Sequence, residues 1–311
     1  MKKKNLVREV TKDDKVVVID GDSIAYIAGW DRAGDPHITH AGIEDVYKKV
    51  DNIIESILLA SEATQILGLL DFLPSFDTDE ERSYNFRNDY AKTKKYKGNR
   101  GSKPEWYIIW APVVHKRLEE FWGFQRVDSR YEVDDAVGAV VKFLIDKEVP
   151  YTIGQNDKDL MQLEGHHFNF REQADAFISK EEAHYKLWHQ VLTGDPTDNI
   201  TGLPGCGAKK ATKVLEATKP AAYPYKVMQE YIKKFGFDTG LQKYFEAYML
   251  VKLREDMSID EYYLIDRKSI KATSLTADVK AFLGTEDTEE LIQESLENSN
   301  FNNLNTDLFD V

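Results

Sequence analysis

Residues 16–20 read Val-Val-Val-Ile-Asp, a short run of apolar, β-branched side chains that ends on a carboxylate. The run does not alternate between apolar and polar residues, which is typical of a strand buried on both faces of a parallel sheet. Two further apolar segments, Gln65–Leu70 and Val149–Ile153, are also followed by acids. The three segments predict strands in the central layer of an α/β domain.

Helical periodicity lies between the predicted strands, where apolar residues recur at helical spacing in 43–58 and in 133–144. Strands that alternate with helices predict a mainly parallel central sheet flanked by helices, which we assign to residues 1–180. From residue 181 to 275 the pattern is helical throughout. The sequence therefore predicts an α/β core followed by a helical region.

Two segments interrupt this plan. Residues 72–123 are polar and basic with no clear strand, and so long an insertion is usually a lid or a binding element. Residues 276–311 are acidic and rich in Asn, which predicts a flexible tail.

Composition restricts the class of protein. The chain has 311 residues, of which 42% are hydrophobic, and a single cysteine. One cysteine excludes an internal disulfide and a cysteine-based zinc site, and fits a reducing compartment such as the cytoplasm. No apolar run reaches the roughly 18 residues of a spanning helix, and no signal peptide is recognisable, so we expect no membrane partner.

The net charge of −13 argues at first against a nucleic-acid partner, but the charge is unevenly distributed. Residues 87–103 contain seven Lys or Arg and one acid, whereas residues 278–311 contain nine acids and one Lys. An acidic protein can therefore still present a basic surface to phosphates.

Carboxylates gather after the predicted strands and at the starts of helices, where ligands of parallel sheets bind. Each small group alone is also typical of a turn or a solvated helix start. Together they require counter-charge, and hard divalent cations with oxygen ligands supply it. Two such cations would activate a water and stabilise the leaving oxygen of a phosphodiester. The predicted metal ligands are Asp20, Asp71, Glu132, Asp134, Asp135, Asp157, Asp159, Asp195 and Asp198.

Two further motifs suit a nucleic acid. In Tyr96-Lys97-Gly98-Asn99-Arg100 aromatic and cationic side chains interleave, as in single-strand binding; the alternative is a solvated basic surface. A glycine-rich turn opening a lysine-bearing helix can hold a phosphate backbone; the alternative is a loop and an ordinary amphipathic helix. The predicted DNA-binding residues are Arg87, Tyr96, Lys97, Arg100, Gly202, Gly205, Gly207, Lys209, Lys210 and Lys213.

Taken in order from Val16 to about Leu215, these motifs resemble the 5′-nuclease superfamily, and most closely bacteriophage 5′→3′ exonucleases and flap endonucleases. Val16–Asp20 resembles the first-strand motif, and Asp71 takes the place of the second-strand carboxylate. The sequence Glu132-Val-Asp134-Asp135 matches Glu-x-Asp-Asp, and Asp157-Lys-Asp159 matches Asp-x-Asp. Gly194-Asp195-Pro-Thr-Asp198-Asn199 matches Gly-Asp-x-x-Asp-Asn.

The resemblance implies a PIN-like core, a helical arch insertion over 72–123 and a helix–three-turn–helix element at Gly202–Ala211. It implies two or more Mg²⁺ ions, replaceable by Mn²⁺, and a K⁺ at the helix–three-turn–helix. Lys97 and Arg100 would contact the scissile phosphate, and Tyr96 would stack on a terminal base. The implied protein is a monomeric, divalent-metal-dependent, structure-specific 5′ nuclease acting in replication on DNA 5′ ends or flaps, or on RNA–DNA primers, and leaving 5′-phosphate products.

Two departures and two alternatives accompany this resemblance. Asp22 adds an acid beside Asp20, which we interpret as a turn residue, and Gln155-Asn156 replaces small hydroxyl residues. A non-catalytic accessory protein that binds forked DNA is the first alternative, and the complete carboxylate set counts against it. A related RNA-cleaving nuclease is the second, but such proteins generally lack the glycine-rich turn.

The end of the chain, Asn305-Thr-Asp307-Leu308-Phe309, resembles the bacterial sliding-clamp-binding pentapeptide, which prefers Gln first and Leu second. Contact of Asp307, Leu308 and Phe309 with a sliding clamp, or of the tail with a single-strand-binding protein, is a further hypothesis. The alternative is an unbound acidic tail. The resemblance to phage proteins places the chain in a cytoplasm, that of the host cell if it is phage-encoded.

Overall fold

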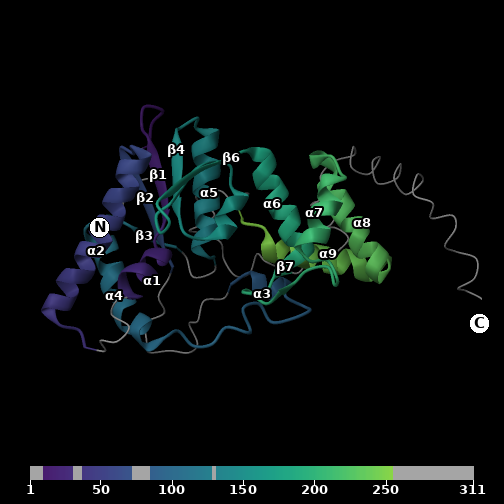
Figure 1. Ribbon diagram of the computed structural model, residues 1–311, viewed down its shortest axis with the longest axis horizontal. Coiled ribbons are helices and arrows are strands. Elements are labelled where there is room, and N and C mark those ends of the chain that lie inside the picture. Colours follow the sequence, from purple (N-terminus) through teal and green to yellow (C-terminus); the bar gives the residue numbers. More distant parts are fainter. Residues whose placement is uncertain (1–9, 31–36, 72–84, 128–130, 255–311) are drawn as a thin grey trace, which may run out of the picture.

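The computed structural model describes residues 10–30, 37–71, 85–127 and 131–254. Its centre is a six-stranded sheet in the order β3-β2-β1-β4-β5-β6, in which only the β5–β6 pair is antiparallel (Figure 1). The strands are β1 (Val16–Asp20), β2 (Gln65–Leu70), β3 (Gln125–Arg126), β4 (Tyr151–Gln155), β5 (Gly165–Asn169) and β6 (Ala174–Ile178). The predicted mainly parallel sheet is confirmed.

Strand order reverses at β1. The chain adds β2 and then β3 on one side of β1, and later adds β4 and β5 on the other side. Such a reversal leaves a crevice at the carboxyl ends of the strands, because the connections on either side of it diverge. The order of the strands thus predicts a site between the ends of β1 and β4.

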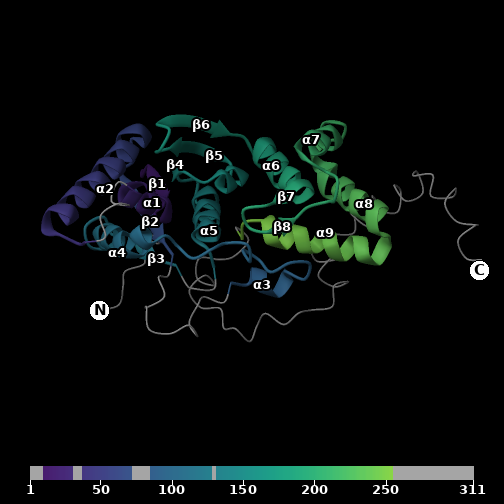
Figure 2. The ribbon, with the colours of Figure 1, turned by 60° about the horizontal axis from the view of Figure 1, so that its bottom comes forward.

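Helices cover both faces of the sheet, as the burial of β1 requires. Successive side chains of a strand point to opposite faces. Val17 and Ile19 pack with α1 (Asp22–Trp30), α2 (His40–Ser61) and α4 (Glu105–Glu120). Val16 and Val18 pack with α5 (Val133–Asp146) on the other face (Figure 2). All five residues of β1 are buried.

Helix α4 belongs to this core, although it lies within the insertion predicted over 72–123. Trp110, Val114 and Leu118 follow one another at four-residue spacing and are fully buried against α1 and α2. The described remainder of the insertion is α3 (Arg87–Tyr90) and a series of turns up to α4. Residues 72–84 lie outside the described part of the chain.

A helical region follows the sheet and has its own core. It comprises α6 (Lys180–Thr193), α7 (Ala208–Glu216), α8 (Tyr223–Phe235) and α9 (Phe237–Val251), with a small ribbon of β7 (Gly194–Asp195) and β8 (Ile200–Thr201). Trp188 of α6 stacks on Tyr244 and Tyr248 of α9, with ring centroids 6.0 and 5.4 Å apart. Short 3₁₀ helices occupy Lys158–Gln162 and Pro220–Ala222.

Two predictions concern the rest of the chain. Within the described residues, no helix combines the length and the apolar character needed to cross a bilayer. The predicted tail, 276–311, and with it Asp307, Leu308 and Phe309, lies outside the described residues.

Candidate functional site

A pocket of 620 Å³ lies at the carboxyl edge of the sheet, where β1, β2 and β4 end. We call it the acidic pocket, because eight carboxylates line it. Lys97, Arg100, Lys103 and Arg171 also line it. Seven of the carboxylates were predicted as metal ligands, and the eighth is Asp22: the set is Asp20, Asp22, Asp71, Glu132, Asp134, Asp157, Asp159 and Asp198.

Asp20 is the last residue of β1 and is 4% exposed. Its carboxylate accepts hydrogen bonds from Ser23 Oγ at 2.6 Å and from Asp22 N at 3.0 Å. Burial raises the pKa of Asp20 to about 6 despite these bonds, and repulsion by Asp157 and Asp71 adds to the effect. The pocket therefore concentrates negative charge that water reaches poorly.

Asp71 and Asp22 lie beside one another at the end of β2. The backbone N–H of Asp71 donates to Asp22 Oδ1 at 3.1 Å. Burial is the main cause that raises the pKa of both carboxyls, and repulsion by Asp71 and Asp20 adds to it for Asp22. Asp22 thus lines the pocket with its side chain, which the interpretation as a turn residue did not include.

The three acids at the start of α5, Glu132, Asp134 and Asp135, have different surroundings. Asp134 faces the pocket, where burial and the charges of Asp20 and Asp157 raise its pKa well above the usual range. Glu132 is different: although burial opposes the change, Lys97 and Arg87 lower its pKa to about 2. Glu132 therefore stays ionised at neutral and mildly acidic pH.

Asp135 points away from the acidic pocket. It is fully buried, and its oxygens accept from Arg87 Nη1 at 2.6 Å and from Arg87 Nη2 at 2.8 Å. The Arg87 side chain is 2% exposed and also donates to the carbonyl of Leu250 in α9. Asp135 and Arg87 thus form a buried structural ion pair. The sequence predicted Asp135 as a metal ligand and Arg87 as a DNA contact.

Asp157 and Asp159 follow β4. Asp157 caps the short helix after the strand by accepting from Asp159 N at 2.8 Å. Asp159 accepts from Gln190 Nε2 at 2.9 Å, while burial and then the charge of Asp157 raise its pKa to about 6. Both side chains line the acidic pocket.

The two acids of the Gly-Asp-x-x-Asp-Asn motif have different surroundings. Asp195 is 2% exposed and accepts from Lys158 Nζ at 2.9 Å and from Thr197 N at 2.8 Å, away from the pocket lining. Asp198 lines the pocket and pairs with Arg100. The structure therefore separates two residues that the sequence placed in one ligand set.

A basic loop, residues 95–100, closes one side of the pocket. It docks on the segment before β8: Lys97 N donates to the carbonyl of Asp198 at 2.8 Å, and Asn199 Nδ2 donates to the carbonyl of Lys95 at 2.9 Å. The Lys97 ammonium pairs with Glu132. Although burial opposes it, Glu132 and Asp198 raise the pKa of Lys97, so the ammonium remains charged.

Tyr96 of this loop is not a surface side chain. It is 6% exposed, its ring packs in the core of the helical region, and its hydroxyl lies 3.0 Å from both Glu132 and Asp198. The resemblance implied that Tyr96 stacks on a base, but the structure encloses its ring. Of the loop residues 95–100, Lys97 and Arg100 line the pocket.

The glycine-rich turn leads into α7 with its lysines in solvent. Gly205 has a φ of +78°, in the left-handed region, and Gly207 is the N-cap of α7. Lys209, Lys210 and Lys213 are exposed. This arrangement offers backbone N–H groups and exposed cations at one helix start, which suits phosphate oxygens.

The donors of the acidic pocket suit hard cations. Burial and mutual repulsion raise the pKa of Asp20, Asp134 and Asp159, so a cation would relieve a charge excess. No three His, Cys, Asp or Glu side chains of the described residues gather tightly enough to form a complete metal cage. Mg²⁺ rarely uses such a cage, because it keeps several waters and binds through one or two carboxylates and substrate phosphates. An open pocket of carboxylates therefore fits it.

No family model matches the chain, but curated relatives do. A 5′–3′ exonuclease of Mycoplasma pneumoniae is 25% identical over 221 residues, which cover 64% of this chain and 71% of that protein. A 5′–3′ exonuclease of Buchnera aphidicola subsp. Schizaphis graminum is 24% identical over 273 residues, 80% of this chain and 90% of that protein. The flap endonuclease Xni of Shewanella woodyi is 25% identical over 181 residues, 53% and 69%.

Solved structures show the same fold. The zinc-bound 5′-exonuclease of bacteriophage T5 superposes with a TM-score of 0.60 over 91% of this chain and 98% of that one, at 15% identity. The chain is a nuclease whose sequence and fold are similar to those of the 5′-nuclease superfamily. A T5 flap endonuclease complex with DNA and metal ions gives a TM-score of 0.59 over the same shares. In this 5′-nuclease the sheet and the helical region are therefore the arrangement common to the fold.

Sequence reasoning missed several side chains around the acidic pocket of this 5′-nuclease. His115 of α4 is fully buried and lies 3.6 Å from Asp22, and Arg126 at the end of β3 donates to the carbonyl of Asp71. Burial and then the Arg126 charge lower the pKa of His115 to about 3, so its ring is neutral. No local pattern marks them, because their partners lie on other strands and helices.

Proposed function

We propose that this 5′-nuclease requires divalent metal ions and hydrolyses phosphodiester bonds of DNA at 5′ ends and flaps, leaving 5′-phosphates. The observation that carries the proposal is the acidic pocket itself: eight carboxylates with Lys97 and Arg100 beside them, at the point where strand order reverses. A phosphodiester brings negative charge and therefore enters such a pocket only with cations present. DNA replication, with RNA–DNA primers as further substrates, is the setting we propose.

The proposed holders of two or more Mg²⁺ ions are the pocket carboxylates that the sequence predicted as ligands and that form no ion pair with a Lys or Arg of the described residues. Bound divalent ions would supply the charge that activates a water and stabilises the leaving oxygen. Mn²⁺ would replace Mg²⁺, since it accepts the same oxygen donors. The proposed ligand set is Asp20, Asp71, Asp134, Asp157 and Asp159.

Lys97 and Arg100 act on the phosphate in this proposal. Both cations line the pocket and are held there by Glu132 and Asp198. Preorganised cations stabilise charge that develops in the transition state without reorganising during the reaction. Glu132 and Asp198 thus position the catalytic cations, which supports a role other than direct ligation for these two acids.

The duplex part of a flap is proposed to lie on α7. Lys209, Lys210 and Lys213 would contact backbone phosphates, which fixes register without reading sequence. The turn at Gly202, Gly205 and Gly207 would bring the backbone close to the DNA and bind a K⁺ through carbonyl oxygens. We also propose that the protein acts as a monomer. Its tail would contact a sliding clamp through Asp307–Phe309, or a single-strand-binding protein.

A 5′-end-labelled flap substrate tests the proposal, with products sized after incubation with Mg²⁺, with Mn²⁺ or with EDTA. Labelled oligonucleotides of flap length would indicate cutting at the junction, and labelled mononucleotides would indicate stepwise removal from the 5′ end. Either product must depend on the added cation. Tight DNA binding without any product in Mg²⁺ or Mn²⁺ would overturn the proposal and favour the accessory protein.

A further inference from the structure

A histidine beside the acidic pocket has a ring nitrogen that the proposed reaction does not use. His115 is fully buried on α4, and within the described part of the chain its Nε2 atom has no hydrogen-bond partner. Nε2 faces Asp22 Oδ1 at 3.6 Å, which is longer than a hydrogen bond. Because buried polar atoms are nearly always paired, an unpaired one directed at a pocket carboxylate requires a reason.

The neighbours of His115 fix which nitrogen carries the proton. Arg126 Nη1 lies 3.5 Å from His115 Nδ1 and donates to the carbonyl of Asp71 at 2.7 Å. Two bonds of 2.9 Å to Glu119 hold the same guanidinium in place. A guanidinium only donates, so Nδ1 accepts and the proton of the neutral ring resides on Nε2. The unpaired group is therefore an N–H directed at Asp22.

The turn after β1 does not need the side chain of Asp22. The turn uses the main-chain N–H of Asp22, which donates to Asp20 Oδ1 at 3.0 Å and which any residue other than proline supplies. The side chain instead lines the acidic pocket, is 22% exposed, and receives the N–H of Asp71 on Oδ1. Its carboxylate thus accepts a backbone N–H and lies 3.6 Å from the Nε2 atom of His115, while it also lines the pocket.

We infer that Asp22 is a further cation-binding carboxylate of this pocket, and that His115, held by Arg126, is the positioning residue that orients it. Partners of this kind behind a ligating carboxylate fix its orientation and tune metal affinity. The inference rests on the proposed function, since it requires that divalent cations bind in the acidic pocket.

Mn²⁺ binding tests the inference without DNA and without turnover. The full-length protein, freed of metal with EDTA and dialysed, is titrated with Mn²⁺, and free Mn²⁺ is measured by its paramagnetic resonance signal. We expect Asp22→Asn to lose one bound ion or to weaken binding by at least about 10-fold. We expect His115→Leu to weaken it by about 10- to 100-fold, the range for lost outer partners of metal ligands. His115→Gln keeps an N–H donor and should stay close to the wild type.

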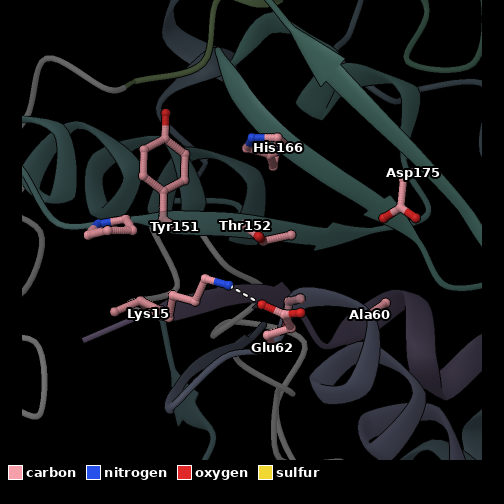
Figure 3. A pocket seen from close by; sticks show the side chains of 10 residues that line it. Lys15, Ala60, Glu62, Tyr151, Thr152, His166 and Asp175 are labelled. Carbon is pink, nitrogen blue, oxygen red and sulfur yellow. Dashed lines mark hydrogen bonds and ion pairs between the residues drawn. The ribbon is translucent and has the colours of Figure 1, made fainter. Parts of the chain in front are cut away.

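Asp175→Asn is the matched control, because it removes one carboxylate from a second cavity that shares no lining residue with the acidic pocket (Figure 3). Thermal melts in EDTA establish that each variant is folded. If the wild type binds Mn²⁺ and Asp22→Asn binds it equally well, the inference is wrong while the proposed function stands. If the wild type binds no Mn²⁺, the proposed function itself is overturned. If only the His115 variants match the wild type, His115 does not position Asp22.

Discussion

The two edges of the central sheet carry cavities of opposite character. At the carboxyl edge, the acidic pocket of 620 Å³ has two buried and six half-buried carboxylates. At the amino edge, a cavity of 310 Å³ is lined by Lys15, Glu62, His166 and Asp175, among others (Figure 3). There Lys15 pairs with Glu62 at 2.5 Å, with side chains 48% and 77% exposed. Negative charge is thus in excess and shielded from water at the carboxyl edge, whereas the amino edge carries an exposed ion pair.

The difference follows from the topology. Parallel strands place all their carboxyl ends at one edge, so the segments after β1, β2 and β4 converge there. Burial then raises the pKa of Asp20, whereas Lys15 lowers the pKa of exposed Glu62 by a hydrogen bond and by its charge. Carboxylates therefore carry a shifted charge balance that favours cation binding at the carboxyl edge only, because only there are they shielded from water.

Charge removal at the carboxyl edge should have the largest effect. Asp157→Asn takes one carboxylate from the acidic pocket, and we expect flap cleavage in Mg²⁺ to fall by about 10²- to 10³-fold, the usual loss when one charge-stabilising group is removed. DNA binding in Ca²⁺ should persist. Asp175→Asn makes the same chemical change in the second cavity, which shares no lining residue with the acidic pocket, and should cleave at the wild-type rate. Equal rates for the two variants would show that the acidic pocket is not the active site.

Breaking the buried ion pair between Arg87 and Asp135 should lower the free energy of unfolding much more than breaking an exposed pair. Arg87→Ala leaves Asp135 charged and fully buried, and breaking such a pair costs about 3–5 kcal/mol in the free energy of unfolding. Urea denaturation followed by circular dichroism measures the change. Lys15→Ala breaks the exposed pair at the amino edge and should leave the midpoint unchanged, because surface pairs contribute little. Similar midpoints for the two variants would remove the distinction between the edges.

The raised pKa of Asp20 predicts a pH-dependent penalty in the metal-free protein. The pKa is about 6 when folded and 3.8 in the reference state, so the folded protein binds the proton more tightly. The resulting stabilisation is complete below pH 3.8 and is lost as the pH rises through about 6. With EDTA present, the wild type should therefore lose stability relative to Asp20→Asn between pH 4 and pH 7. Mg²⁺ should reduce this difference at pH 7; a constant difference across that range would contradict the shifted pKa.

Much of the fold could be predicted because its signals are local. The apolar run of β1 and the helical spacing of α2 and α5 identify these elements within their own windows. Strand β3 has only two residues, and β6 exposes four of its five, so neither carries an apolar pattern long enough to recognise. The pairing of β6 with β5 is a tertiary preference that no single segment encodes.

The candidate site was predictable in outline and not in detail. Topology alone indicates that acids after parallel strands meet, but it does not tell Asp134 from Asp135. Successive helical residues differ by about 100° around the axis, so one faces the pocket and the other reaches Arg87, 48 residues away in sequence. Tyr96 shows the same limit, because its burial depends on the core of the helical region.

The smallest predicted effect concerns α7. Lys213 is exposed, and in the proposed function it contacts one phosphate of the duplex. Each phosphate contact releases about one counterion, so Lys213→Ala should lower the slope of log affinity against log salt by about 0.9. Fluorescence anisotropy with a labelled duplex at several salt concentrations measures that slope. Lys15→Ala removes an equal charge at the amino edge and should leave the slope unchanged. If both lysines change it equally, net charge rather than position governs binding, and α7 is not a specific contact surface.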